Sequence, residues 1–159
     1  MDAKEAITVG NRGWYVSYIP ADAKWYVAEL VSETKVEDDQ RNVVHRDFVL
    51  VEASSPEEAY EKSLQLGREN NATFENPEGK VVRITFRGIA ELGVIGAELK
   101  HGTEILFKEQ IGVPENRIQQ LIAPKERLGV FCPIEPSAGP NYASRDVLKE
   151  VDTILKNQE

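Results

Sequence analysis

The sequence predicts a single α+β domain, in which a mainly antiparallel sheet of about five to six strands is covered on one face by helices. Segments of alternating apolar and polar side chains, typical of strands, recur along the first 111 residues, and one strongly helical pattern interrupts them. The length of 159 residues suits one domain with its own core. We expect this domain to span residues 1–134, followed by a linker and a C-terminal amphipathic helix over 135–159.

Trp-Tyr-Val occurs twice near the start of the chain, at residues 14–16 and 25–27, on either side of a Pro-Ala-Asp turn signal. The alternation predicts a hairpin that places Trp14, Tyr18 and Trp25 on one face. Aromatic cross-strand pairs stabilise hairpins, and each buried Trp or Tyr removes about 150 to 250 Å² from water. Trp and Tyr also dominate ligand pockets and protein-binding faces. Both interpretations of the doubled motif stay open at this point.

The other predicted strands follow from apolar patterns separated by turn-rich segments. Residues 33–42 are charged and indicate an exposed loop, and the glycine-containing residues 88–96 read as a connection. Continuous or alternating apolar patterns predict strands at 43–53, 80–89, 103–111 and 126–131.

A helix over residues 56–69 has the best local signal in the chain. Ser55 is placed to cap it, Pro56 takes the first helical position, and Glu58 lies three residues after the cap, as in a capping box. Small side chains at 59, 63 and 67 recur every four residues, so this face can lie close to the sheet.

Two further helices are predicted after the sheet. A short one near 114–122 would turn Ile118, Leu121 and Ile122 inward. The C-terminal one begins after Ser144 as a possible cap. Its apolar stripe needs a partner surface, either the same domain or a second copy of the chain in a dimer. The stripe consists of Val147, Leu148, Val151, Ile154 and Leu155.

From Trp25 to about Phe131 the order of these signals resembles the bacterial domain-of-unknown-function family 4288. The matching segments are Trp25-Tyr26, the strand and capped helix in "FVLVEASSPEEAYEKSLQLGRE", and the strands "VVRITFRGI" and "ILFKEQIGV". The resemblance implies no activity and no catalytic residues, because none is established for the family.

Composition excludes several classes of function. The net charge of -8 disfavours nucleic acid and anionic lipid as partners, and no apolar run approaches the ~20 residues that cross a bilayer. The N-terminus lacks the features of a secretion signal. Cys132 is the one cysteine, expected to be a buried structural thiol, and a lone cysteine argues for a reducing compartment. We therefore expect a cytoplasmic protein.

No catalytic, metal or cofactor motif is present in the sequence, so we predict no metal site and no cofactor. His45 and Asp47 share a strand face, and Arg83 and Arg87 share another. Each pair could serve a site, but exposed polar pairs and sheet ion pairs are the commoner explanation.

These patterns favour a non-catalytic binding or protein-interaction module, for example an acidic antidote or regulator that masks a basic protein. The alternative is a small-molecule sensor or small enzyme. Its pocket would lie between the sheet and the aromatic hairpin and would use His45, Asp47 and Arg83 or Arg87 as polar groups.

Overall fold

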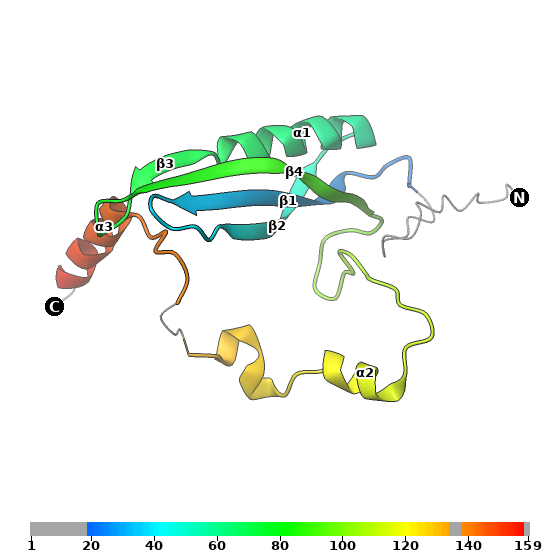
Figure 1. Cartoon of the computed structure of the whole chain (residues 1–159). Helices are drawn as coiled ribbons and strands as arrows, with labels where there is room; N and C mark the ends of the chain where they lie inside the picture. The colour runs from blue at the N-terminus through cyan, green and yellow to red at the C-terminus, as the bar shows by residue number, and fades with distance from the viewer. Residues whose placement is uncertain (1–18, 134–137, 158–159) are drawn as a thin grey trace, which may run out of the picture.

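The computed structural model of the chain describes residues 19–133 and 138–157. Its central element is a four-stranded sheet in the order β2-β1-β4-β3, in which every neighbouring pair is antiparallel. The strands are β1 (Trp25–Val36), β2 (Val43–Glu52), β3 (Ala72–Glu75) and β4 (Val81–Ile95). One helix, α1 (Pro56–Glu69), lies along one face of this sheet (Figure 1). The predicted α+β class and the antiparallel sheet are therefore confirmed.

The described sheet has four strands, so the expected five to six are not confirmed. Residues 103–111 form no strand, and residues 126–131 fall in two 3₁₀ turns, Lys125–Arg127 and Gly129–Phe131. Alternating side chains make a strand only where a neighbouring strand offers hydrogen bonds, and these segments have no such neighbour among the described residues. The first strand of the predicted aromatic hairpin, with Trp14 and Tyr18, lies outside the described residues.

Two strands are longer than predicted. β1 continues to Val36, through the first part of the expected loop, and β4 continues through the expected connection at 88–96. The register between β1 and β4 shifts twice, so that Arg87 and Ala90 have no partner in β1. Gly88 lies between these bulges with a φ of 146°, a conformation that favours glycine. The glycine that suggested a connection is thus the residue that lets the strand bend and continue.

The core lies between α1 and the sheet. Its buried residues come from β1, from the end of β2 and from α1: Tyr26, Ala28, Leu30, Val51, Ala53 and Ala59. Ala59, Ser63 and Gly67 are the buried residues of α1, which confirms the predicted small-residue face. Because these side chains are small, the helix axis lies close to the strands, and larger side chains of β4 fill the remaining space.

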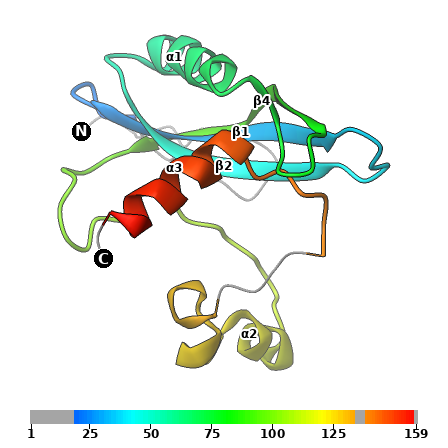
Figure 2. The same cartoon turned by 90° about the vertical axis from the view of Figure 1, so that its left-hand side faces the viewer.

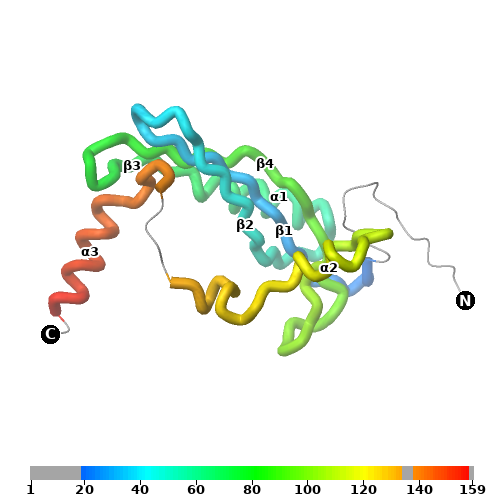
Figure 3. The backbone as a smooth tube through the Cα atoms, turned by 60° about the horizontal axis from the view of Figure 1, so that its bottom comes forward, coloured from blue at the N-terminus to red at the C-terminus, as the bar shows by residue number. Residues whose placement is uncertain are grey.

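Residues 103–133, called the strap below, follow β4 after the loop at 96–102 and run toward the C-terminal segment (Figure 3). They stand away from the sheet (Figure 1). The strap contains a short helix, α2 (Glu115–Leu121), close to its predicted position. Ile118, Leu121 and Ile122 were expected to point inward, but they are 41%, 69% and 71% exposed. Cys132 is exposed and free, so the expected buried thiol is also wrong. The helical pattern was correct, whereas the surface it should cover is absent from the described chain.

The C-terminal helix, α3 (Arg145–Lys156), has the predicted cap, since Ser144 Oγ accepts a hydrogen bond from the Val147 N–H at 3.4 Å. Figure 2 shows α3 as a separate rod that extends away from α1, and Figure 1 places it beyond one end of the sheet. No residue of α3 is buried.

Candidate functional site

The strap leaves many of its large apolar side chains exposed. Nine of them are more than 40% exposed, a density unusual for the surface of a protein that acts alone. They are Ile105, Phe107, Ile111, Ile118, Leu121, Ile122, Leu128, Val130 and Phe131. The strap also carries four acidic and four basic side chains, so its contacts with any partner would be apolar rather than governed by net charge.

The chain that follows the strap is fastened to the sheet. Asn76, in the turn between β3 and β4, is 1% exposed and donates from Nδ2 to the Asn141 carbonyl at 2.9 Å. Asn141 in turn donates to the Glu78 carboxylate at 2.9 Å, and Pro140 is buried beside them. The start of α3 is tied to the same end of the sheet, because Arg145 pairs with Glu75 at 2.5 Å.

α3 therefore projects from a fixed base with its apolar stripe uncovered. The five stripe residues, Val147, Leu148, Val151, Ile154 and Leu155, are between 46% and 60% exposed. A helix with so strong a separation of apolar and polar side chains draws most of its stability from a surface that covers the apolar side. Among the described residues, none provides that surface.

The sheet face opposite α1 is polar at its centre. Glu29, 2% exposed, pairs with Arg46 of β2, and Glu33 pairs with Arg87 of β4 at 3.2 Å. Asn42 donates to Glu33 at 2.8 Å, and this bond, with the charges of Lys35 and Arg87, lowers the pKa of Glu33. Both carboxylates are engaged in ion pairs within the sheet, so they are poorly placed to act as general bases.

The candidate polar residues do not form one site. His45 lies opposite Ser32 and Asp47 opposite Leu30, on the face that α1 covers, whereas Arg83 lies opposite Lys35 on the other face. Arg87 is held by Glu33 on that second face. The His45 ring meets the Tyr142 ring edge-on, with 5.5 Å between centroids, so His45 supports the chain that leads to α3.

Trp25 lies at the start of β1 and lines a cleft of 430 Å³ together with the end of β4. The cleft also includes Lys24, whose ammonium lies 6.0 Å from the Trp25 ring centroid. Ser32 is seven residues further along β1, so His45 is roughly 20 Å from this cleft. The cleft has the volume of a ligand pocket, but the predicted polar residues do not reach it.

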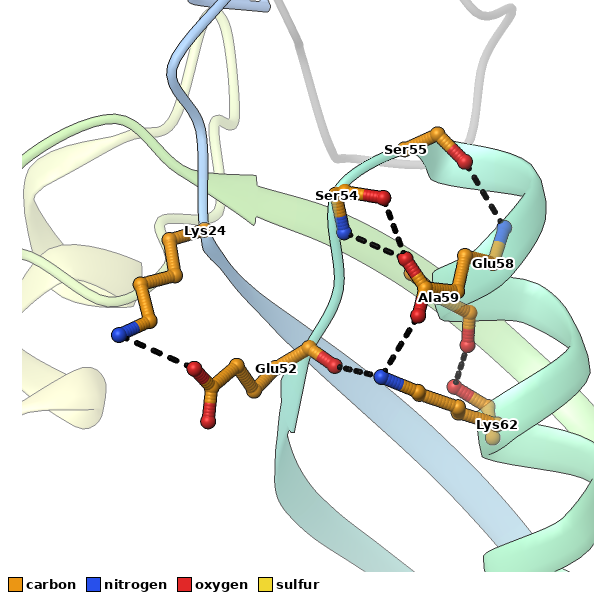
Figure 4. Close-up of polar contacts among 8 residues, drawn as sticks. Lys24, Glu52, Ser54, Ser55, Glu58, Ala59 and Lys62 are labelled. Carbon is orange, nitrogen blue, oxygen red and sulfur yellow. Dashed lines mark hydrogen bonds and ion pairs between the residues drawn. The ribbon is translucent and has the colours of Figure 1, made fainter.

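A second cleft, of 510 Å³, lies where β2 leads into α1 (Figure 4). Glu58 accepts hydrogen bonds from the N–H and hydroxyl of Ser54 at 2.7 and 2.6 Å, and pairs with Lys62 at 2.8 Å. Lys62 also donates to the Glu52 carbonyl, and Lys24 pairs with the Glu52 carboxylate at 3.0 Å. Each of these four charged side chains has a partner, so this network stabilises the junction.

The capping box at this junction differs from the predicted one by one residue. Ser55 Oγ accepts from the Glu58 N–H at 3.1 Å, as expected, but the Glu58 carboxylate returns to Ser54 instead of the Ser55 backbone. The hydrogen bond from Lys62, followed by those from Ser54, lowers the pKa of Glu58 to about 2. A carboxylate at a helix N-terminus is favoured further by the helix dipole.

Two absences concern the described part of the chain. No group of three or more His, Cys, Asp or Glu side chains there could hold a metal ion. No helix in residues 19–133 or 138–157 is both long and apolar enough to cross a bilayer.

Sequence reasoning missed the residues that fasten the C-terminal segment. The Asn-Pro-Glu-Gly turn at 76–79 was predictable, and asparagine commonly bonds to the backbone two residues later, as Asn76 does to the Glu78 N–H at 3.0 Å. Its bond to residue 141 joins positions 65 apart, for which the sequence carries no local signal. Arg145 and Glu75 were missed for the same reason.

The family model for a domain of unknown function, DUF4288, matches residues 25–107, more than half of the chain, and the protein belongs to this family. The match covers the whole described sheet and α1 and ends within the strap. No curated protein and no solved structure matches the chain.

Proposed function

We propose that this protein is a non-catalytic protein-interaction module whose binding surface consists of the strap and α3. The observation that carries the proposal is the set of fourteen large apolar side chains that these two segments leave exposed. Large apolar side chains exposed in this number indicate a protein-binding surface, because their exposure to water is unfavourable until a partner covers them.

The contacts that hold the C-terminal segment to the sheet support a binding role for α3, because a helix that merely packed loosely would not need a fixed base. Asn76 and Asn141 hold the chain before α3, and the ion pair between Glu75 and Arg145 holds its first residue. The apolar stripe of α3 stays exposed. A binding element held in a fixed place loses less conformational freedom when its partner arrives.

A narrower version of this proposal is an acidic antidote or regulator of a basic protein, and the net charge of -8 supports it. The strap and α3 each carry equal numbers of acidic and basic side chains, so the acidic excess lies elsewhere in the chain. A basic partner would therefore also contact the sheet domain. We propose a cytoplasmic location, supported by the exposed free thiol of Cys132, which an oxidising compartment would modify.

The test compares the triple variant I118D/L121D/I122D with the wild-type protein. We expect an unchanged unfolding temperature, because these side chains are exposed in the chain alone, and loss of the partner retained by the immobilised wild-type protein. A matched control, N116D/Q119D/Q120D, adds three carboxylates to the same helix and should still retain the partner. A triple variant that unfolds at a clearly lower temperature would contradict the proposal, because the strap would then be part of the core.

A second candidate function is small-molecule binding in the cleft beside Trp25, favoured by its volume of 430 Å³ and by the Trp25 side chain that lines it. Native mass spectrometry of the gently purified protein tests it. A retained mass of a few hundred daltons that W25A no longer holds would support this function, and the bare chain mass would contradict it.

A further inference from the structure

We infer that α3 is a self-association helix, which pairs in antiparallel orientation with α3 of a second copy to form a weak symmetric dimer. This inference rests on the proposed function and names the partner of one half of the binding surface. The strap remains available for a different protein.

The spacing of the apolar stripe indicates another helix as the partner. Leu148, Val151 and Leu155 follow the three-and-four spacing of a coiled-coil seam, and Val147 and Ile154, seven residues apart, widen one side of that seam. The stripe runs from Val147 to Leu155, over nine of the twelve residues and about 14 Å of the helix. A helix of the same length and the same seam is the simplest surface that would cover it.

Charge favours a second copy over a basic protein at this surface. α3 carries three basic side chains, Arg145, Lys149 and Lys156, and three acidic ones, Asp146, Glu150 and Asp152. The helix is therefore neutral within a chain of net charge -8, so two copies can approach without the repulsion that the rest of the surface would cause. A helix that recognised a basic protein would be expected to carry an acidic excess.

The same charges favour the antiparallel arrangement. Asp146 lies in the first turn of α3 and Lys156 in the last, so antiparallel helices bring these opposite charges to the same end of the pair. Parallel helices would place Lys156 beside Lys156 and align the two helix dipoles. The antiparallel order also pairs Leu148 of one copy with Leu155 of the other when Val151 lies near the symmetry axis.

The base of α3 makes the pairing geometrically feasible. Arg145 and Asn141 hold the N-terminal end against the turn between β3 and β4, and the helix extends away from the sheet from there. Two sheets would consequently lie at opposite ends of the helix pair rather than against each other. Their acidic surfaces are kept apart.

The size of the pair sets the expected affinity. Ten apolar side chains, five from each copy, form a contact well below the 20 to 30 residues a side of a standard stable interface. We therefore expect a dissociation constant on the order of 10 to 100 μM.

Sedimentation velocity of the full chain, from about 5 to about 500 μM, tests the inference. The wild-type protein should shift from monomer to dimer across this range, and V151E should stay monomeric because it places a carboxylate in the seam. T153E, which adds the same charge to the opposite side of α3, should dimerise like the wild type. Circular dichroism checks that both variants keep their helix content.

Disulfide trapping tests the orientation. In a C132S background, equal amounts of L148C and L155C are mixed under mild oxidation and compared with each variant alone. Antiparallel pairing predicts preferential cross-links between L148C and L155C, whereas preferential like-with-like links would overturn the antiparallel pair.

These outcomes separate the two proposals. A wild-type protein that stays monomeric throughout, or a V151E variant that still dimerises, overturns the inference about α3. The role of the strap in binding another protein would then still be decided by the triple strap variant. Loss of partner retention by that variant supports the proposed function whether or not α3 self-associates.

Discussion

Gly67 of α1 lies directly against the ring of Phe86 in β4, so closely that a β-carbon on residue 67 would overlap the ring. The helix can approach the sheet at this point only because residue 67 has no side chain. Phe86 occupies the space that results and packs against the core cluster.

Substitution of this glycine should consequently destabilise the fold. G67A would force the Phe86 ring or the helix to move, and overpacking of this kind costs about 1 to 3 kcal/mol, which outweighs the helix propensity gained from alanine. Urea unfolding measures the change. The double variant G67A/F86L should regain part of the loss because leucine vacates the overlap, and a G67A protein as stable as the wild type would show that α1 is not held at this distance.

Glu58 should make stability depend on pH. Its pKa is lowered to about 2 by the hydrogen bonds from Lys62 and Ser54, against an ordinary value of about 4.3 in the unfolded chain. The carboxylate therefore stabilises the fold fully above pH ~4.3, and this contribution is lost as the pH falls toward 2. The free-energy difference between the wild type and E58Q should be largest near pH 6 and shrink through this interval.

Asp39 also contributes to the pH dependence of stability, because its hydrogen bonds with Arg41 lower its pKa to about 2. The comparison between the wild type and E58Q cancels this contribution, since both proteins contain Asp39. Urea unfolding at several pH values measures both proteins. A difference that stays constant from pH 6 to pH 2 would mean that the Glu58 network does not form in the folded protein.

Asn76 should control both the turn between β3 and β4 and the base of α3. N76A removes the acceptor for the N–H groups of Glu78 and Lys80, at 3.0 and 2.9 Å, and should cost about 1 to 3 kcal/mol. N76D keeps that acceptor but loses the amide that donates to the Asn141 carbonyl. Hydrogen exchange of residues 138–145 should accelerate in both variants, while N76D alone keeps slow exchange in the turn. Unchanged exchange at 138–145 in N76D would show that the segment is held by other contacts.

The buried carboxylate of Glu29 should depend on its partner. Its side chain is 3% exposed, it pairs with Arg46, and Glu91 lies opposite it in β4. R46A leaves two neighbouring carboxylates without the cation and should lower the free energy of unfolding by about 1 to 3 kcal/mol. E29Q in the R46A background should recover much of this loss, since it removes the uncompensated charge. Additive effects of the two substitutions in a double-mutant cycle would mean that the pair contributes nothing.

Local signals predicted α1 and α3 well, for physical reasons that act within one or two turns. Ser55 and Ser144 cap these helices through backbone groups three residues away, so each helix start could be predicted from neighbouring residues alone. Strands require a partner strand that can lie far away in the sequence. That is why the alternating pattern at 103–111 was misread as a strand and the glycine-containing end of β4 as a connection.

The candidate site also combines features that local sequence patterns predict with features that depend on distant contacts. The stripe of α3 was predicted in full, because it follows from helical spacing, whereas its lack of cover could be learned only from where the chain places it. His45 and Asp47 share one face, as expected, but the register with β1 puts Arg83 on the other face, where Glu33 also holds Arg87. The residues that fasten residues 140–145 to the sheet could not be predicted at all.

The sequence by itself determined the α+β class, the two capped helices and the family, because spacing, capping and turn chemistry are local properties. Only the tertiary structure decided how many strands pair, which side chains share a face and which apolar segments stay uncovered. Those features depend on contacts between residues tens of positions apart, such as Asn76 with Asn141, and no local pattern records them.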